Sequence, residues 1–233
     1  MQFVRRRFLK KYLLPRKLFS IITPVYNCGS KIEATIESVW SQKPGLFEHI
    51  IVDGGSTDQT LASIKRSRYP FTLVSEKDSG VYDAMNKGID FACCKYLYFL
   101  GAGDRLEPGI LEKIAPLMPR QKLAFVYGNV LWEGHNKIYD GEFSKEKMKA
   151  GINICQQAIF YERRIFDLLG RFETRFSVLA DHAMNIKCFG RDEISKIYID
   201  AVIARFEGGG LCVHQPDHTF AQELPNLIKT YLK

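Results

Sequence analysis

The sequence has no hydrophobic run that approaches the length of a membrane-spanning helix. Its N-terminus lacks the continuous apolar segment and the small-residue cleavage site of a signal peptide. The six cysteines show no C-x-x-C spacing, and the one adjacent pair, Cys93 and Cys94, cannot build a disulfide framework. The five histidines are scattered, so the sequence offers no cluster of Cys and His ligands for zinc. These absences predict a cytoplasmic protein whose cysteines are reduced thiols in the core.

Two phosphate-binding signatures are also missing. The segment after the first predicted strand reads TPVYN (residues 23–27) in place of a G-x-G-x-x-G fingerprint, which argues against an NAD-dependent enzyme. No G-x-x-x-x-G-K-[ST] motif occurs either, so a P-loop NTPase is disfavoured.

Positive charge is concentrated at the N-terminus. Of the 33 lysines and arginines, seven lie before residue 18 with no acidic residue among them, which leaves 26 basic against 26 acidic residues in the remainder. The balanced remainder predicts no nucleic-acid partner. The basic tail, residues 1–17, also carries apolar side chains, so it forms either a peripheral contact with an anionic membrane, a solvated terminus or an arm that docks on the domain. The first alternative would place the protein at the inner face of the plasma membrane.

The first hundred residues alternate between short apolar runs and amphipathic segments. Apolar runs bounded by turn residues predict strands, and apolar spacing of three to four residues predicts helices. The strands are expected at 18–23, where Pro24 should stop the first, and at 49–53, 71–75 and 96–100; the helices are expected at 30–42, 59–68 and 82–93. This alternation predicts a parallel sheet covered by helices, which is typical of nucleotide-binding proteins.

The second half of the chain has a less regular order. Helices are predicted near 108–118 and at 144–150, 163–169, 180–188 and 223–232; strands are predicted at 123–130 and 197–206, with a hairpin partner at 137–139. The mixture indicates a mixed sheet. No repeat or Pro/Ser-rich linker interrupts the sequence, so residues 18–233 are expected to form one domain.

Carboxylates follow two of the predicted parallel strands. Asp53 ends one strand, and Asp104 ends the turn after the apolar run of KYLYFLGAGD (residues 95–104). Carboxyl ends of parallel strands meet at one edge of a sheet, so both side chains are expected in one cleft. Such a pair suits a sugar nucleotide, because one carboxylate can accept hydrogen bonds from a base or ribose while the other holds a divalent cation. The alternatives are that Asp53 caps a turn or helix and that Asp104 caps the helix starting near Glu107.

The sequence resembles the family 2 glycosyltransferases, which have the GT-A fold, and in particular the small bacterial members that build surface polysaccharides. The resemblance runs from Phe19 to about Asp104 and is carried by FSIITPVYN, IESVWSQ, HIIVDGGSTDQT, SEKDSGVYDAMNKGI and YLYFLGAGDRL. Two later segments, QQAIFYERRIFDLLGRF and LADHAMNIK, are similar to the family's acceptor half. The resemblance implies a Rossmann-like, mostly parallel central sheet flanked by helices, with a nucleotide-sugar-binding half over 18–104 and a smaller mixed-sheet acceptor half over 105–233.

The resemblance also implies roles for residues in the first half. Pro24, Tyr26 and Asp53 match positions that frame the nucleotide base and ribose, and Asp78 lies in the loop that completes this pocket. Asp104 matches the last carboxylate of the family's D-x-D metal motif.

The metal motif is incomplete in this sequence. Ala102 stands where the family often has the first aspartate. A single carboxylate with two phosphate oxygens can still hold Mg²⁺ or Mn²⁺, because these ions keep several waters and borrow substrate oxygens. His214, after the segment EGGG (207–210), is a weaker candidate metal ligand.

Asp181, in the segment LADH, matches the family's general base. A base is required because the acceptor hydroxyl must lose its proton as it attacks the anomeric carbon. Asp181 could also cap the helix over 180–188, and both roles could hold at once. His182 is an alternative base. Gln156 and Gln157 either contact the acceptor or make ordinary hydrogen bonds at a sheet edge.

The function implied is that of an inverting, hexosyltransferase-type enzyme. It would move a sugar from a nucleotide-diphosphate donor to a saccharide or lipid-linked acceptor in the biosynthesis of capsule, O-antigen or exopolysaccharide. Two alternatives remain: a nucleotidyltransferase on a similar core, which would normally have a Gly-rich first loop with an activating Lys or Arg, and a catalytically silent binding protein of the same fold.

Overall fold

The computed structural model describes residues 17–139, 141–208 and 216–233. Almost all of the basic tail and His214 therefore lie outside the described residues, and their predicted roles are not tested here. Within the described part of the chain, no helix has the length and apolar character needed to cross a membrane.

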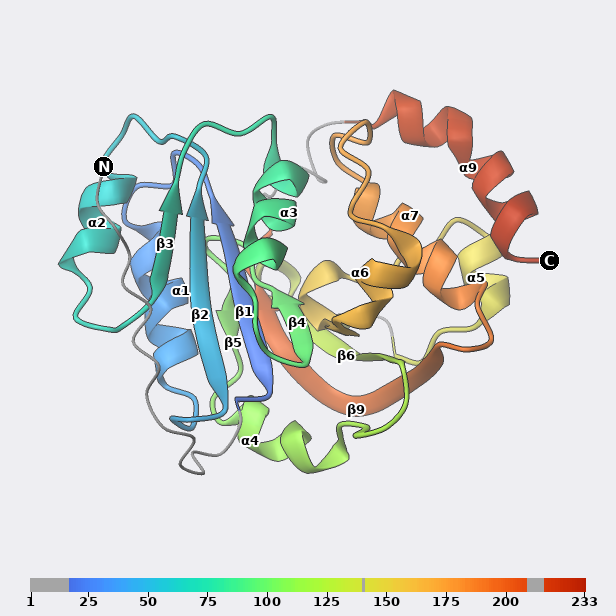
Figure 1. The fold of residues 1–233 in the computed structure, drawn as a ribbon, viewed down its shortest axis with the longest axis horizontal. Helices are drawn as coiled ribbons and strands as arrows, with labels where there is room; N and C mark the ends of the chain where they lie inside the picture. The colour runs from blue at the N-terminus through green and yellow to red at the C-terminus, as the bar shows by residue number, and fades with distance from the viewer. Residues whose placement is uncertain (1–16, 140, 209–215) are drawn as a thin grey trace.

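A nine-stranded sheet runs through the molecule in the order β3-β2-β1-β4-β8-β6-β9-β5, with β7 paired to β6 (Figure 1). The strands are β1 Phe19–Val25, β2 Phe47–Asp53, β3 Thr72–Ser75, β4 Tyr96–Phe99, β5 Arg105–Leu106, β6 Ala124–Trp132, β7 Lys137–Tyr139, β8 Ile159–Glu162 and β9 Ser195–Phe206. The segments β3, β2, β1 and β4 pair in parallel, as predicted. This arrangement brings their carboxyl ends to one edge of the sheet.

Helices cover both faces of the parallel half, which explains why β1, β2 and β4 are almost entirely buried. The helices α1 Lys31–Trp40 and α2 Thr60–Arg66 pack on one face, and α3 Val81–Phe91 packs on the other (Figure 1). Gly88 of α3 allows the close packing, because a Cβ there would lie 2.4 Å from Cγ2 of Ile22.

The first strand continues through Pro24, contrary to the prediction that Pro24 stops it. Pro24 pairs with Val52 of β2, while the ladder on the other side of β1 ends at Ile22 with Phe99. The backbone of Val25 faces β2, since its carbonyl accepts from the N–H of Gly54, so Pro24 faces the opposite side. The N–H that proline lacks would thus point where no strand is left to receive it.

The second half of the sheet is mixed, as predicted. The strand β8 runs antiparallel between β4 and β6, β6 and β9 are parallel, and β5 pairs antiparallel with the end of β9. The sequence did not predict the two-residue strand β5. Through this pairing the long strand β9 reaches back to the residues that follow Asp104.

The remaining helices pack mainly around this second half. They are α4 Ile110–Ile114, α5 Lys145–Lys149, α6 Arg164–Leu169, α7 Ala180–Phe189 and α9 His218–Tyr231, with 3-10 turns η1 Ala115–Leu117, η2 Glu133–His135 and η3 Gln156–Ala158. All ten residues of α7 are buried. The helix α9 starts five residues before the predicted 223, because the Asp217 carboxylate caps it by accepting from the N–H of Phe220 (3.0 Å).

Candidate active site

A cavity of about 1380 Å³ lies at the carboxyl ends of the parallel strands and extends between the two halves of the sheet. Its wall includes five of the predicted site residues: Pro24, Tyr26, Asp78, Asp104 and Asp181. They come from distant parts of the sequence, as the prediction of a shared cleft required. Asp53 does not belong to the wall, although its neighbours Gly54 and Gly55 do.

Tyr26 and Pro24 form the rim at the end of β1. The side chain of Tyr26 is 62% exposed, so its ring is free to stack on a planar ligand. The next residue, Asn27, has a positive φ of 45° and ties this rim to the neighbouring loop. Its N–H donates to Ser56 Oγ (2.9 Å), and its side-chain oxygen accepts from the N–H of Thr57 (2.9 Å).

Asp53 is fully buried and holds the loop that follows β2. Its carboxylate accepts hydrogen bonds from the N–H groups of Gly55 and Ser56 and from the hydroxyl of Ser75 (2.8 Å). These are the contacts expected of a turn-stabilising aspartate, the alternative that the sequence left open. Its predicted contact with the base or ribose stays a prediction.

Asp78 lies on the cavity wall in the loop between β3 and α3. Its carboxylate accepts from the N–H of Gly80 (3.0 Å) and lies directly over Gly54. A Cβ at Gly54 would be 2.3 Å from Oδ2 of Asp78, so only glycine leaves room for this carboxylate. The pairing of Gly54 with Asp78 was not predicted, because the two residues lie on different loops.

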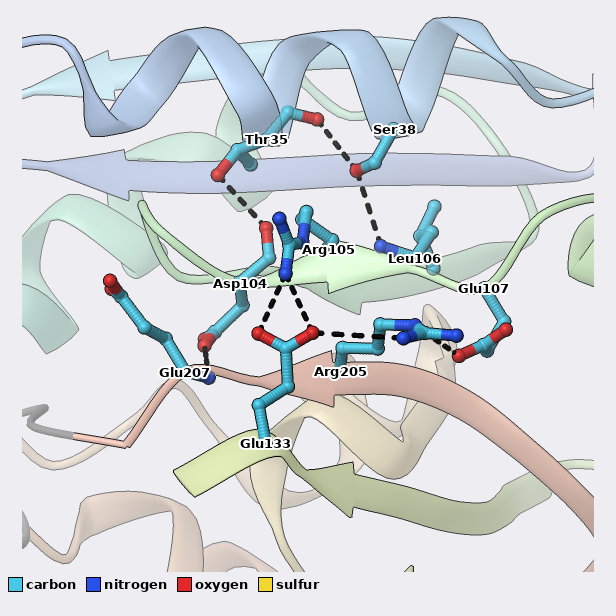
Figure 2. Close-up of polar contacts among 9 residues, drawn as sticks. All are labelled: Thr35, Ser38, Asp104, Arg105, Leu106, Glu107, Glu133, Arg205 and Glu207. Carbon is cyan, nitrogen blue, oxygen red and sulfur yellow. Dashed lines mark hydrogen bonds and ion pairs between the residues drawn. The ribbon is translucent and has the colours of Figure 1, made fainter. Parts of the chain in front are cut away.

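Asp104 is buried to 6% exposure, and two residues of the second half hold its carboxylate. Figure 2 shows the contact with Glu207. Oδ1 accepts from the backbone N–H of Glu207 (3.1 Å), and Oδ2 accepts from the side-chain amide of Gln157 (2.5 Å). The helix-cap reading of Asp104 is wrong, because α4 begins after Gly109 and receives no side-chain cap. Gln157, whose role the sequence left open, thus contacts the candidate metal carboxylate.

Two further carboxylates lie near Asp104, and each is paired with a cation: Glu207 with Lys31, and Glu133 with Arg105 and Arg205. Burial, together with the charges of Glu207 and Glu133, raises the pKa of Asp104 to about 6, although hydrogen bonds from Gln157 and the Glu207 backbone act to lower it. The Glu207 side chain also lines the cavity, where both of its oxygens accept from the ammonium of Lys31 (2.9 and 3.0 Å).

The carboxylate oxygens of Asp104 fit Mg²⁺ or Mn²⁺, because these ions prefer oxygen ligands. Burial penalises the ionised form of Asp104, and a divalent cation beside the carboxylate would stabilise that form. Ala102 offers the ion no ligand, so Asp104 is the residue of the motif that would hold it, with the remaining positions left to water and phosphate oxygens.

Asp181 lies in the first turn of α7, one residue inside the helix. The N-cap position belongs to Leu179, so the reading of Asp181 as the N-cap is wrong. Side chains hold its carboxylate: Tyr82 Oη lies 2.6 Å from Oδ1, and the Asn153 amide donates to Oδ2 (2.9 Å). Burial raises the pKa of Asp181 above its usual range, while the hydrogen bonds from Tyr82 and Asn153 act to lower it. A carboxylate with a raised pKa that faces a cavity is suited to accept a proton.

His182 is not among the residues of the cavity wall. Its ring lies 4.8 Å from the ring of Phe220, and burial lowers its pKa to about 4. Asp181 is therefore the better placed of the two candidate bases. Asn153, which the sequence did not predict, comes from an irregular segment between α5 and η3.

The sequence also missed a cluster at the opposite edge of the sheet. Glu48, Cys93 and Cys94 have ligand atoms within 4.8 Å of one another, and the Cys93 thiol lies 2.9 Å from the Glu48 carboxylate. Cys93 is exposed, so the expectation that the cysteines lie in the core does not hold for it.

Known proteins similar in sequence are glycosyltransferases. Residues 20–178 match the family described as Glycosyl transferase family 2. The chain is 39% identical over 215 residues to the PGL/p-HBAD biosynthesis glycosyltransferase of Mycobacterium tuberculosis, which covers 89% of this chain and 84% of that protein. It is 30% identical over 184 residues to the chondroitin synthase of Escherichia coli, which covers 73% of this chain and 26% of that protein.

Solved glycosyltransferase structures share the fold. S. aureus TarS in complex with UDP-GlcNAc has a TM-score of 0.74 at 17% identity and covers 92% of this chain and 65% of that chain. The mannosyltransferase PcManGT from Pyrobaculum calidifontis, in complex with GDP-Man and Mn²⁺, has a TM-score of 0.65 at 17% identity and covers 93% of this chain and 68% of that chain. The predicted GT-A fold is confirmed, and the match over residues 20–178 shows that the chain belongs to glycosyl transferase family 2.

Proposed function

We propose that the protein is an inverting glycosyltransferase that moves a hexose or related sugar from a nucleoside-diphosphate donor to a hydroxyl group of a cell-surface glycan or its lipid-linked precursor. One observation carries the proposal: Asp104 and Asp181 line the same cavity. They reach it from opposite sides, Asp104 after β4 and Asp181 from α7.

The donor is proposed to bind against residues of the first half, 18–104, with its acceptor held by residues of 105–233 in the same domain. Tyr26 and Pro24 at the rim suit the nucleoside, and Asp78 offers carboxylate oxygens to a base or ribose. TarS bound to UDP-GlcNAc and PcManGT bound to GDP-Man support a nucleotide-sugar donor.

Mg²⁺ or Mn²⁺ is the proposed cofactor, with Asp104 as its protein ligand. When bound, the ion would neutralise charge on the donor's diphosphate. The Mn²⁺ in the PcManGT complex supports this part of the proposal.

Asp181 is proposed to act as the general base. Its carboxylate would take the proton of the acceptor hydroxyl while the hydroxyl oxygen forms a bond to the anomeric carbon. The bond from that carbon to the diphosphate oxygen breaks with its electron pair on the leaving nucleoside diphosphate. One such displacement inverts the anomeric configuration.

The relatives support a role in surface glycan synthesis. The name of the mycobacterial protein places it in PGL/p-HBAD biosynthesis, and another relative is a chondroitin synthase. The proposed acceptor is a saccharide or a lipid-linked saccharide. The basic tail, residues 1–17, is proposed to make a peripheral contact with an anionic membrane.

Calorimetric titration with UDP, GDP, dTDP and CDP, each with and without Mn²⁺, tests the donor site without an acceptor. We expect one of the four to bind, more tightly with Mn²⁺, and to lose the Mn²⁺-dependent part of its affinity in Asp104→Asn. Absence of binding to all four would favour the silent binding protein. Release of pyrophosphate from a nucleoside triphosphate and a sugar 1-phosphate would favour the nucleotidyltransferase.

The stereochemistry can be tested with water as the acceptor. With the α-linked nucleotide sugar of the base identified by calorimetry, early ¹H NMR spectra should show the β anomer of the released sugar before it mutarotates. Initial release of the α anomer would contradict inversion.

A further inference from the structure

Thr35 of α1 is fully buried, and its one hydroxyl group contacts the backbone of both Gly103 and Asp104. Figure 2 shows the contact with Asp104. The hydroxyl donates to the carbonyl of Asp104 (2.9 Å) and accepts from the N–H of Gly103 (2.9 Å). A hydroxyl has one proton to donate, so Thr35 makes both contacts without leaving either group unpaired.

Ser38, one turn further along α1, makes a similar pair of contacts (Figure 2). Its hydroxyl donates to the carbonyl of Thr35 (2.8 Å) and accepts from the N–H of Leu106 in β5 (3.2 Å). Two side chains of one helix face thus hold consecutive points of the segment 103–106. Thr35 holds the loop at Asp104 itself, and Ser38 holds the strand after it.

Hydrogen bonds hold both the backbone and the carboxylate of Asp104. The helix α1 fixes its backbone through Thr35, while Gln157 and the N–H of Glu207 fix its carboxylate. The preceding residue, Gly103, has a φ of 103° and no side chain that could anchor the loop. The N–H of Asp104 donates to the carbonyl of Gly101 (3.1 Å) within the same loop, so the two Thr35 contacts are the ones that tie the backbone of Asp104 to a helix. The position of the carboxylate therefore depends on Thr35 together with Gln157 and the N–H of Glu207.

That dependence matters because the metal motif retains a single carboxylate. With Ala102 in place of an acid, no neighbouring ligand in the loop compensates for a displaced Asp104. A displacement of about 1 Å in a catalytic constellation is enough to cost about a hundredfold in rate.

We propose that Thr35 is a positioning residue: its hydroxyl sets the place of the Asp104 carboxylate for the cation and diphosphate of the donor. The inference rests on the proposed function of Asp104 in donor binding. The inference gives α1 a role in placing a donor-binding carboxylate. The amphipathic sequence of α1 predicts only a helix that covers the sheet.

The test compares Thr35→Val, which removes the hydroxyl at nearly constant volume, with Thr35→Ser, which keeps it. For Thr35→Val we expect a loss of about tenfold to a hundredfold in the Mn²⁺-dependent affinity for the nucleoside diphosphate that binds the wild type, and a similar loss in transfer. Thr35→Ser should restore both. Thr35→Ala, which places no methyl group against Gly103, serves if the valine variant does not fold.

Ser20→Ala is the matched control. Ser20 of β1 is also fully buried and is not part of the cavity wall, and its hydroxyl likewise makes two contacts, donating to the Glu48 carboxylate (2.5 Å) and accepting from the N–H of Cys94 (3.1 Å). Its removal lowers stability through the same kind of loss without touching the segment 103–106. We expect Ser20→Ala to keep the Mn²⁺-dependent affinity of the wild type at a temperature well below the unfolding transitions of the variant and the wild type.

The outcomes separate the inference from the proposed function. If Asp104→Asn loses Mn²⁺-dependent binding while Thr35→Val keeps it, or if Ser20→Ala loses as much as Thr35→Val, the positioning role is overturned. If Asp104→Asn also binds normally, or the wild type binds none of the four diphosphates, the proposed role of Asp104 fails and the inference fails with it.

Discussion

Asp104 and Asp181 face one cavity, but the protein holds them in different ways. Around Asp104, contacts reach both the backbone and the carboxylate, from α1, from the end of β9 and from Gln157. Around Asp181, side chains hold the carboxylate, those of Tyr82 and Asn153. A substitution near Asp104 therefore moves a loop, whereas a substitution near Asp181 changes the proton affinity of a carboxylate that stays in place on a helix.

The largest expected effect separates the two carboxylates by what they bind. We expect Asp181→Asn to lower kcat by about 10³-fold, because an amide cannot accept the acceptor's proton, while the affinity for the nucleoside diphosphate with Mn²⁺ stays unchanged. Asp104→Asn should instead lose that affinity. Turnover assays and calorimetry on both variants provide the measurement, and equal losses of donor affinity in both would break the distinction.

The pH dependence of kcat is the next test of the difference. Burial raises the pKa of Asp181, and a base must be ionised, so kcat should fall as pH drops through that raised pKa. An aspartate usually has a pKa of about 4, so the acidic limb of kcat should lie at a higher pH than that. Asp181→Asn, whose side chain does not titrate, should lose this limb from its residual activity. A limb that persists unchanged in Asp181→Asn would assign it to another group.

Tyr82→Phe should sharpen the same limb. The Tyr82 hydroxyl has one proton and two acceptors at 2.6 Å, Oδ1 of Asp181 and the carbonyl of Val178. When it donates to Asp181, it stabilises the ionised carboxylate and acts to lower that pKa. Its removal should therefore move the acidic limb to higher pH, so that kcat at a pH on this limb is lower than in the wild type; a change of about 1.4 kcal/mol in the free energy of ionisation corresponds to about a factor of ten. Tyr96→Phe is a matched control, because its hydroxyl also bonds a backbone carbonyl at 2.6 Å, that of Pro119, and Tyr96 is not part of the cavity wall. A shift to lower pH in Tyr82→Phe would contradict the proposed direction.

The parallel half of the fold was predictable because its signals are local. Each of its strands is a short apolar run followed by turn residues, and each helix has an apolar face of its own. The strand β5 was not predictable, since it is two residues long and exists through pairing with Arg205 and Ala204, about a hundred positions later in the chain. Pro24 was misjudged because the rule that proline ends a strand ignores which side its missing N–H faces.

The site was predictable to the same extent. Asp104 followed from its place after a strand, and Asp181 from the family resemblance, but the groups that hold them come from other segments. Gln157 and Asn153 lie in or beside irregular structure, where no periodicity indicates direction. The burial of Asp53 behind its own turn could not be read from the sequence either, because an aspartate in a Gly-rich turn looks the same whether it faces the turn or the cleft.

The smallest expected effect concerns the ion pair at the edge of the Asp104 region. Lys31 and Glu207 are 62% and 42% exposed, so their contact at 2.9 Å should contribute less than about 1 kcal/mol to the free energy of unfolding. The pair of Lys43 and Glu112, 55% and 58% exposed at 2.7 Å, is a matched control away from the cavity. Urea unfolding of Lys31→Met and Lys43→Met should therefore give similar small losses. A loss above about 2 kcal/mol in Lys31→Met alone would exceed what an exposed pair provides, and would mean that the Asp104 loop is held by charge as well as by the hydroxyl groups of α1.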